Sequence, residues 1–357
     1  MQIATAFPLK LAEALAPLGQ PRQCALLNYP NHLNIGDHLI WAGTVDYLRR
    51  VTRTHIAYTA DLDTFSSRAL NRALAPGDPI LLHGGGSLGD LWPDRQQFHE
   101  RIAAAHRERP LILLPQSVHF ADPALARRAA EAFNGHGDLT IFARDRHSHS
   151  IASALFSACR VYLAPDMVFQ LAGRLGASKH GIAAAATTLW LARGDREAAP
   201  GDFGTAASGF VRQDWVSYDR KWRWGNRRAP FSRTIARWYR EIWQRGLSHP
   251  EERRERAEWL RVLPAVPDCA FSMSLVADGC RQLSAHRAVI ADRLHAHLLA
   301  TLLGIPNVLR ANSDAKNSGF FETWMREVPW CRFAANASEL PPALDAAIAS
   351  RPEGEPF

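Results

Sequence analysis

The sequence is poor in the residues that mark a disulfide-bonded, zinc-binding or membrane-spanning protein. Its five cysteines are scattered, odd in number and without C-x-x-C spacing, so they predict neither a metal site nor a disulfide framework. No apolar run reaches about 18 residues, and no basic segment followed by an apolar core opens the chain, so we expect neither a spanning helix nor a signal peptide. These absences predict a cytoplasmic protein.

Lysine is also scarce, with only four in the chain, so the net charge of +7 comes almost entirely from arginine. A GC-rich coding bias would explain the excess of arginine over lysine, and we slightly favour this interpretation. The alternative is a basic face for anionic substrates, lipid headgroups or nucleic acid. Because the sequence has no helix-turn-helix, zinc finger or aromatic RNA-binding signature, we expect no nucleic-acid partner.

The 357 residues are 47% hydrophobic and 22% charged, which is typical of a soluble chain with two domains. Short apolar runs recur, and each ends in a polar cluster. The composition becomes Ala-rich after about residue 181, so we expect domains at 1–182 and 183–357. The repeated pattern predicts an α/β fold with parallel sheets and ligands at the carboxyl ends of the strands. The predicted strands are 24–27, 80–83, 111–114, 139–143, 161–164, 188–192, 288–290 and 307–309.

The segment from about 198 to 260 is an insertion dense in tryptophan and arginine. One interpretation is an amphipathic surface that faces a membrane. We favour the other, in which the tryptophans pack helices against the second domain.

The stretch 291–297 places an acid, an arginine and two histidines between a predicted strand and a predicted helix. The start of such a helix attracts anions through free N–H groups and the helix dipole, and the planar fork of Arg293 suits carboxylate or phosphate. Because an unperturbed imidazole titrates near neutral pH, we expect His295 and His297 to be able to exchange protons there. They lie two residues apart and therefore on different faces of the helix, which argues against a metal site. The stretch predicts an anionic substrate and a proton to move.

Three further polar clusters each have a structural and a functional interpretation. Gly84–Asp90 is either a tight turn leading from a strand to a helix or a loop that offers N–H groups to an anion. Asp37 is either a helix N-cap, which we favour locally, or part of the cleft wall that holds sugar hydroxyls or acts as a base. Asp166 likewise caps the next segment or points into the cleft.

Arg144 follows the fourth predicted strand, and the same two kinds of interpretation apply to it. It is either a clamp for a carboxylate or part of a solvated turn in which Ser148 caps the next helix. A lone histidine is more often structural than catalytic. His83 is therefore expected to be buried and hydrogen-bonded, and His119 has no assigned chemistry from its surroundings alone.

The ordered set of motifs resembles the polysaccharide pyruvyl transferase family, and within it the bacterial exopolysaccharide enzymes. The matching elements span roughly residues 25 to 320. The resemblance implies two Rossmann-like domains that face each other across a cleft, a GT-B-like arrangement. The motifs are Asn34–Asp37, His83–Gly86, Pro115–Ser117, Ala143–Ser148, Ala164–Asp166 and Asp292–His295.

The resemblance also implies the reaction. Phosphoenolpyruvate would be the donor, with no separate cofactor, and a sugar of a lipid-linked repeat unit the acceptor. The product would be a pyruvate ketal, with release of phosphate. Arg293, Leu294 and His295 match the donor-binding triplet of the family, and Arg144 matches the arginine aimed at the donor. An acceptor carried on a lipid would bring the enzyme into peripheral contact with the inner membrane.

We assign roles on this basis. His295 is the expected general acid, and Asp37 or Asp166 orients or deprotonates the acceptor hydroxyl. The remaining donor-binding candidates are Gly85, Gly86 and Lys316, and the acceptor-binding candidates are Asn34 and His119. The alternative function is a GT-B glycosyltransferase that uses a nucleotide sugar. No Glu-x7-Glu-type pattern in the second half supports it.

Overall fold

The computed structural model describes residues 3–175, 187–194, 209–218, 269–312 and 315–351. Most of the predicted insertion at 198–260 lies outside these ranges. Within its described part, Trp215 is 1% exposed and belongs to the main hydrophobic core, as the packing interpretation predicts for that residue. Among the helices described, none combines the length and the apolar character needed to cross a membrane.

The first half of the chain forms a parallel sheet, as its repeated strand pattern predicts. The strand order is β2-β1-β3-β5-β6-β7, and β4 pairs with β5 off this path. Every pairing in it is parallel. The strands are β1 (Gln23–Leu27), β2 (His55–Ala60), β3 (Ile80–Leu82), β4 (Gly85–Gly89), β5 (Leu111–His119), β6 (Leu139–Ala143) and β7 (Arg160–Leu163).

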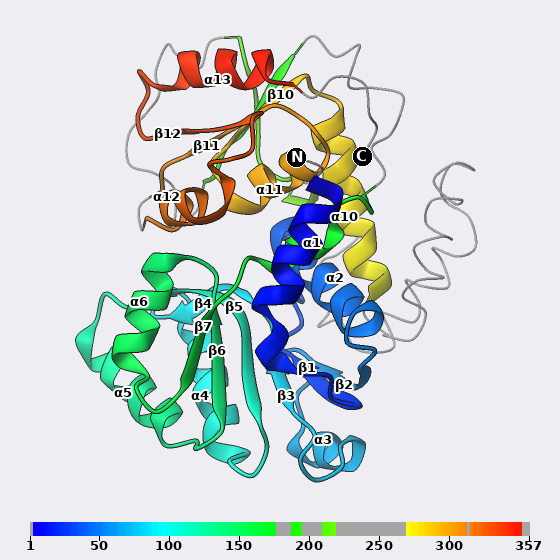
Figure 1. Cartoon of the computed structure of the whole chain (residues 1–357), viewed down its shortest axis with the longest axis vertical. Coiled ribbons are helices and arrows are strands. Elements are labelled where there is room, and N and C mark those ends of the chain that lie inside the picture. Colours follow the sequence, from blue (N-terminus) through cyan, green and yellow to red (C-terminus); the bar gives the residue numbers. More distant parts are fainter. Residues whose placement is uncertain (1–2, 176–186, 195–208, 219–268, 313–314, 352–357) are drawn as a thin grey trace.

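Helices cover both faces of this sheet, because its strands bury side chains on both sides. In β1, Leu26 enters a core with α1, α2 and η2, while Ala25 and Leu27 enter a second core with α3, α4, α5 and α6. Figure 1 shows α1 and α2 on one side of the sheet. Helices α4, α5 and α6 belong to the core on its other side. The bounds are α1 (Ile3–Ala14), α2 (Ile35–Arg50), α3 (Ser67–Ala73), α4 (Pro93–Ala105), α5 (Pro123–Asn134), α6 (Arg146–Leu155), η1 (Ala16–Leu18) and η2 (Met167–Leu171).

The second half forms another parallel sheet, in the order β12-β11-β10-β8-β9. Its predicted strands are confirmed, whereas β9 and β12 were not predicted, and neither was β2 in the first half. The strands are β8 (Thr188–Leu191), β9 (Val211–Gln213), β10 (Ala288–Ala291), β11 (Asn307–Arg310) and β12 (Cys331–Ala334). The helical elements are η4 (Val216–Tyr218), α10 (Cys269–Ser284), α11 (Leu294–Leu302), α12 (Lys316–Phe320), η5 (Phe321–Met325) and α13 (Leu340–Ala349).

The two halves share a hydrophobic core, since α2 packs against both α10 and α11. The long helix α10 runs from the level of the second sheet down to α2 (Figure 1). A Cβ atom on Gly279 of α10 would come within 2.9 Å of Ile35 Cγ2 at the start of α2, so this glycine permits the close contact. The division at residue 182 stays a prediction.

The glycine-rich segment Gly84–Asp90 is not the tight turn from strand to helix that was one of its two interpretations. Gly85–Gly89 instead forms β4, beside the long β5. Gly89 has a φ of +135°, and a Cβ atom there would lie 1.7 Å from His119 O. Only glycine allows β4 to approach β5 this closely. The following helix, α4, begins only at Pro93.

Candidate active site

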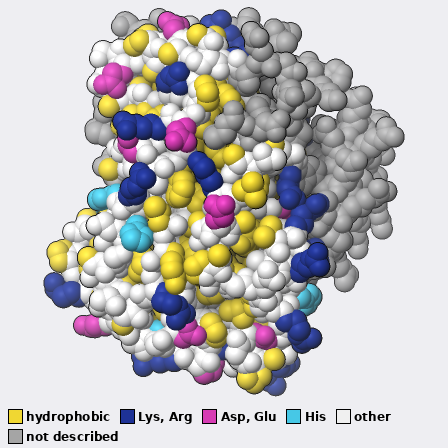
Figure 2. Space-filling view, in the orientation of Figure 1, with side chains coloured by type: hydrophobic (Ala, Val, Ile, Leu, Met, Phe, Trp, Pro, Cys, Tyr) yellow, Lys and Arg dark blue, Asp and Glu magenta, His cyan; other side chains and the backbone are white. Residues whose placement is uncertain are grey.

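A cleft of about 360 Å³ lies where the two halves meet, and residues of both halves line it. Among the described residues, its wall holds five cationic side chains but a single carboxylate, that of Asp37. On the face shown in Figure 2, Lys and Arg side chains lie near the level of this junction. The lining residues are His32, Leu33, Asn34, Asp37, His83, Gly84, Gly86, Ser87, Trp92, Arg95, Arg144, Arg193, Trp215, Tyr218, Arg293, Leu294, His295, Lys316 and Asn317.

Arg144, Asp166 and His295 form one polar cluster, although the sequence places them at three different strand ends. Arg144 Nη1 donates to Asp166 Oδ2 at 2.8 Å, and its Nε donates to Ser117 Oγ at 2.8 Å. His295 Nε2 lies 3.3 Å from Asp166 Oδ2 and 3.4 Å from Arg144 Nη1. This cluster joins β5, β6 and η2 of the first half to α11 of the second.

Asp166 caps the next segment, as one of its two interpretations predicts, but it does not line the cleft. Its Oδ1 caps η2 by accepting from Val168 N, while its Oδ2 faces the arginine and the histidine. Burial alone would raise the pKa of this fully buried carboxyl. The charges and hydrogen bonds of His295 and Arg144, together with the Val168 N–H, outweigh burial and lower its pKa below the ordinary value. Asp166 therefore stays ionised and holds the two cleft side chains in place.

Two glycines allow backbone to approach this cluster closely. A Cβ atom on Gly36 would lie 2.7 Å from His295 Nδ1, so a larger residue at the start of α2 would displace the imidazole. A Cβ atom on Gly86 would lie 3.6 Å from both Arg144 Nη2 and Lys316 Nζ. The predicted donor-binding residues Gly86, Arg144 and Lys316 thus come together at one place in the cleft.

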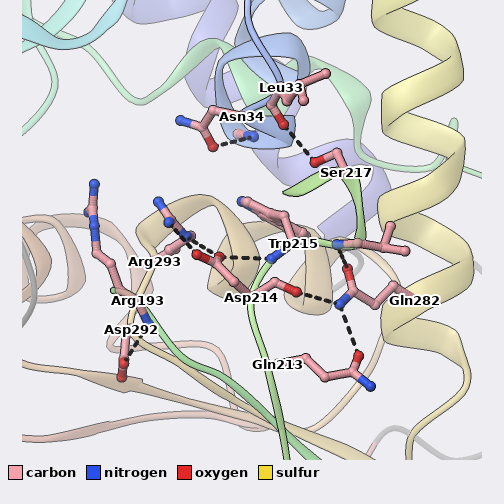
Figure 3. A network of polar contacts seen from close by, with 12 residues as sticks. Leu33, Asn34, Arg193, Gln213, Asp214, Trp215, Ser217, Gln282, Asp292 and Arg293 are labelled. Carbon is pink, nitrogen blue, oxygen red and sulfur yellow. Dashed lines mark hydrogen bonds and ion pairs between the residues drawn. The ribbon is translucent and has the colours of Figure 1, made fainter. Parts of the chain in front are cut away.

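Arg293 forms a bidentate ion pair with Asp214, which no local motif predicts. Its Nε and Nη2 donate to the two carboxylate oxygens of Asp214 at 2.7 and 2.8 Å (Figure 3). Its guanidinium carbon also lies 5.4 Å from the ring centre of Tyr218. Ser217 Oγ, in the same segment, donates to Leu33 O at 2.6 Å, so this segment connects Arg293 to the first half of the chain.

Asp292, the acid of the predicted motif, is a structural residue behind the cleft. Its Oδ1 accepts from Arg310 Nη1 at 2.7 Å and from Trp190 Nε1 at 3.2 Å. Its Oδ2 accepts from the backbone N–H of Arg193 at 3.0 Å (Figure 3). These contacts fix the carboxyl ends of β8, β10 and β11, from which Arg193 and Arg293 reach the cleft.

Asp37 lies in the first turn of α2, but the N-cap is Asn34. The Asn34 side chain accepts from Gly36 N at 3.2 Å and donates to Asp37 Oδ2 at 3.0 Å. His32 Nε2 lies 3.3 Å from the same oxygen. Burial raises the pKa of Asp37, but the charges of His32 and then Arg95 outweigh burial and lower it below the ordinary value. The prediction of Asp37 as a cap was wrong, and its carboxylate faces the cleft.

A similar correction applies at the start of α6. Asp145, not Ser148, is the N-cap of this helix, since its Oδ1 accepts from Ser148 N at 2.7 Å. Arg144 is 3% exposed, so the solvated-turn interpretation of it was wrong as well. His83 is buried as predicted, but neither ring nitrogen has a hydrogen-bond partner among the described residues, so its expected hydrogen bonding was also wrong.

The cleft gathers most of the predicted site residues. Asn34, Asp37, Gly86, Arg144, Arg293, Leu294, His295 and Lys316 line it. Gly85 and His119 are not among the lining residues, and Asp166 lies behind the wall. The lining residues that the sequence did not indicate as functional include His32, Trp92, Arg95, Arg193, Trp215, Tyr218 and Asn317.

Several buried histidines predict a steep loss of stability in mild acid. Burial lowers the pKa of His38, His83, His99 and His297 to about 3 each. Because the unfolded chain binds these protons below about pH 6.5, stability falls as pH drops from that value toward 3. At pH 5 each histidine would lower the free energy of unfolding by about 2 kcal/mol, since each pH unit below 6.5 contributes about 1.4 kcal/mol.

The measurement is urea unfolding at pH 7 and pH 5, for the wild type and for His297→Leu. His297 is 0% exposed and lies against Phe321, away from the cleft lining. Between pH 7 and pH 5, the free energy of unfolding of the variant should fall by about 2 kcal/mol less than that of the wild type, by the same linkage. An identical loss in both proteins would show that His297 does not titrate on unfolding as described.

The fold and the site thus define an α/β protein with a strongly cationic cleft between two parallel sheets. The model of the polysaccharide pyruvyl transferase family matches residues 34–314, which is most of the chain. The chain therefore belongs to this family.

Individual relatives agree with the family match. The chain is 27% identical over 340 residues to "Putative pyruvyl transferase EpsO" of Bacillus subtilis, covering 92% of this chain and 94% of that protein. It is 28% identical over 316 residues to "Pyruvyl transferase 1" of Schizosaccharomyces pombe, covering 85% and 70%. A crystal structure of an uncharacterised Klebsiella pneumoniae protein matches with a TM-score of 0.56 at 17% identity, covering 93% of this chain and all of that one, and shares its fold.

Proposed function

We propose that this protein transfers the pyruvyl group of phosphoenolpyruvate to two hydroxyls of one sugar, forming a ketal and releasing phosphate. The observation that carries the proposal is the cluster of Arg144, His295 and Lys316, which places cations and an imidazole at one position in the cleft. Phosphoenolpyruvate carries a carboxylate and a phosphate, and fixed cations bind both groups. Membership in the pyruvyl transferase family supports this donor over a nucleotide sugar.

The donor site would be built from both halves of the cleft. Arg144 and Lys316 flank Gly86, where the absence of a side chain leaves room for an anion. Arg293 and the N-terminus of α11, beginning at Leu294, extend the same wall. Arg144 is held by Ser117 and Asp166, and Arg293 by Asp214, so both forks are fixed before the donor arrives.

His295 would act as the general acid. It gives a proton to the methylene carbon of the donor, and one acceptor hydroxyl then forms a bond to the adjacent carbon. The bond from this carbon to the phosphate oxygen breaks, and the second hydroxyl forms the other bond of the ketal. The two hydroxyls release two protons. One proton is matched by the proton added to form the methyl group, and the other leaves on the released phosphate. Asp166 supports His295 through its 3.3 Å contact.

Asp37, rather than Asp166, would be the base for the acceptor hydroxyl. Asp37 lines the cleft and stays ionised, whereas Asp166 is 0% exposed and is engaged by Arg144 and His295. We expect Asp37→Asn to lower kcat by about 10²- to 10⁴-fold with little change in the melting temperature. Asp166→Asn should lower the melting temperature as well, since it removes a buried ion pair.

The two variants are compared by steady-state kinetics and thermal unfolding. A variant Asp37→Asn with wild-type kcat would overturn the base assignment. The proposed reaction itself is tested by mass spectrometry of candidate sugar acceptors incubated with phosphoenolpyruvate. The expected product gains one pyruvate with loss of water, and one phosphate is released for each product.

The wider setting belongs to the same proposal. We place residues 1–182 and 183–357 in a GT-B-like arrangement, because each half has its own parallel sheet and both contribute to the cleft. The acceptor would be a lipid-linked oligosaccharide or polysaccharide precursor, modified by an enzyme at the cytoplasmic face of the inner membrane. Phosphoenolpyruvate would act as a co-substrate, with no further cofactor.

A further inference from the structure

A second cationic position in the cleft lies apart from the proposed donor site. Gly85 and Gly86 are consecutive residues of β4 and face in different directions. A Cβ atom on Gly85 would lie 3.7 Å from Asp37 Oδ1, whereas one on Gly86 would lie 3.6 Å from Arg144 Nη2 and Lys316 Nζ. The start of β4 therefore has Asp37 beside Gly85 and the donor-side cations beside Gly86.

Arg95 provides the cation on the Asp37 side. It lies in the first turn of α4, is half-buried and lines the cleft. Among the described residues no carboxylate lies within ion-pair distance of it. It makes a polar contact with a neutral amide, since its Nη1 donates to Asn28 Oδ1 at 3.0 Å. Its charge nevertheless acts on Asp37, whose pKa it helps to lower.

The amide that holds Arg95 is itself fixed in orientation. Asn28 is fully buried at the end of β1, in a left-handed conformation with a φ of +64°. Its Nδ2 lies 3.3 Å from Nε2 of the fully buried His99. Burial lowers the pKa of His99 to about 3, so this imidazole is neutral and its Nε2 accepts from the amide. Asn28 Oδ1 is thereby directed at Arg95.

The surroundings of Arg95 leave it without a direct anionic partner among the described residues. Asp94 shares the first turn of α4, whose dipole opposes a cation there, and Asp37 feels the charge of Arg95 from across the cleft. The neighbouring side chains His32, His83 and His99 are neutral near pH 7, because burial lowers their pKa values to about 4, 3 and 3. A bound anion would give the guanidinium a direct charged partner.

His83 is a second, independent indication of a ligand at this position. It is 2% exposed and lines the cleft, and neither ring nitrogen has a hydrogen-bond partner among the described residues. A buried polar group normally has a partner, and a neutral imidazole offers one N–H donor and one acceptor. It can therefore donate to an anion and accept from a sugar hydroxyl.

We propose that Arg95 and His83 form a subsite for an anionic group on the acceptor, either the carboxylate of a uronic acid or a sugar phosphate. The inference rests on the proposed function, because it assumes that the acceptor diol lies at Asp37. Arg95 then selects acceptors whose negative charge lies next to the reacting hydroxyls. His83 completes the hydrogen bonding of the same group.

The test compares the binding of three probes by calorimetry at low salt: methyl β-glucoside, methyl β-glucuronide and glucose 1-phosphate. The wild type should bind at least one charged probe about tenfold or more tightly than the neutral glucoside, with the preference shrinking as salt rises. A preference for the glucuronide identifies the anion as a carboxylate, and one for the phosphate identifies it as a phosphate. Equal binding of all three overturns the proposal.

Two variants assign the preference to Arg95. In Arg95→Gln the charged and neutral probes should bind equally, and in Arg95→Lys most of the preference should remain. The matched control is Arg101→Gln, which removes the same charge from an exposed residue of the same helix and should leave the preference unchanged. A preference that survives in Arg95→Gln overturns the assignment.

Phosphoenolpyruvate binding separates this inference from the proposed function. Arg95→Gln should bind phosphoenolpyruvate as the wild type does, because the donor side is intact. A parallel loss of phosphoenolpyruvate and charged-probe binding would place Arg95 in the donor site and overturn the inference. If the wild type binds the charged probes but not phosphoenolpyruvate, the proposed function fails while the anionic subsite stands.

Discussion

Replacing Arg144 with methionine is expected to lower kcat/KM for phosphoenolpyruvate by about 10³-fold or more and to destabilise the fold. The guanidinium is 3% exposed and forms a 2.8 Å ion pair with the fully buried Asp166, which His295 also contacts at 3.3 Å. Removing one partner of a buried ion pair leaves an uncompensated charge and costs about 3–5 kcal/mol. Removing a fixed donor to a developing or bound charge costs about 10²- to 10³-fold on its own.

A double variant separates these two effects. Arg144→Met combined with Asp166→Asn removes both charges, and the asparagine can still cap η2 at Val168 N. Stability in urea should largely return, because replacing a buried pair by neutral groups is often near neutral. Activity should stay lost. Recovery of activity together with stability would show that Arg144 has only a structural role.

Replacing His295 with glutamine is expected to lower kcat by about 10²- to 10⁴-fold, as loss of a general acid does. KM for phosphoenolpyruvate should change little, because Arg144, Arg293 and Lys316 remain in the donor site. His295 is 12% exposed on its side chain, so glutamine fits without leaving a large buried cavity. The fold should therefore remain intact, as checked by circular dichroism.

The matched control is His55→Gln, on an exposed residue of β2 outside the cleft, which should have wild-type kinetics. A variant with near-normal kcat would remove His295 from the role of acid.

The parallel sheets and one side of the cleft follow directly from the strand pattern. Arg144, Asp166 and His295 each come after an apolar run, and the carboxyl ends of parallel strands meet at one edge. That rule brought together three residues up to 151 positions apart in the sequence. The family resemblance added the donor, which the local chemistry had indicated only as an anion.

The rest of the site depends on contacts that leave no local signal. Asp214 lies 79 residues before Arg293, and the two meet because β9 pairs with β8 at the edge of the second sheet. Arg95 carries no local signal of a site, and it reaches the cleft because α4 packs against β4 and Asn28 holds its guanidinium. The β4 strand was missed because glycine-rich segments have low strand propensity, and tertiary packing against β5 overrides it.

The central claim is tested most directly by a thermal-shift titration with phosphoenolpyruvate, beside UDP-glucose, GDP-mannose and inorganic phosphate. A ligand that binds only the folded state raises the melting temperature with its concentration. We expect a concentration-dependent rise with phosphoenolpyruvate that disappears in Arg293→Ala, and no comparable rise with either nucleotide sugar. A rise with a nucleotide sugar alone would contradict pyruvyl transfer and point to glycosyl transfer on the same fold.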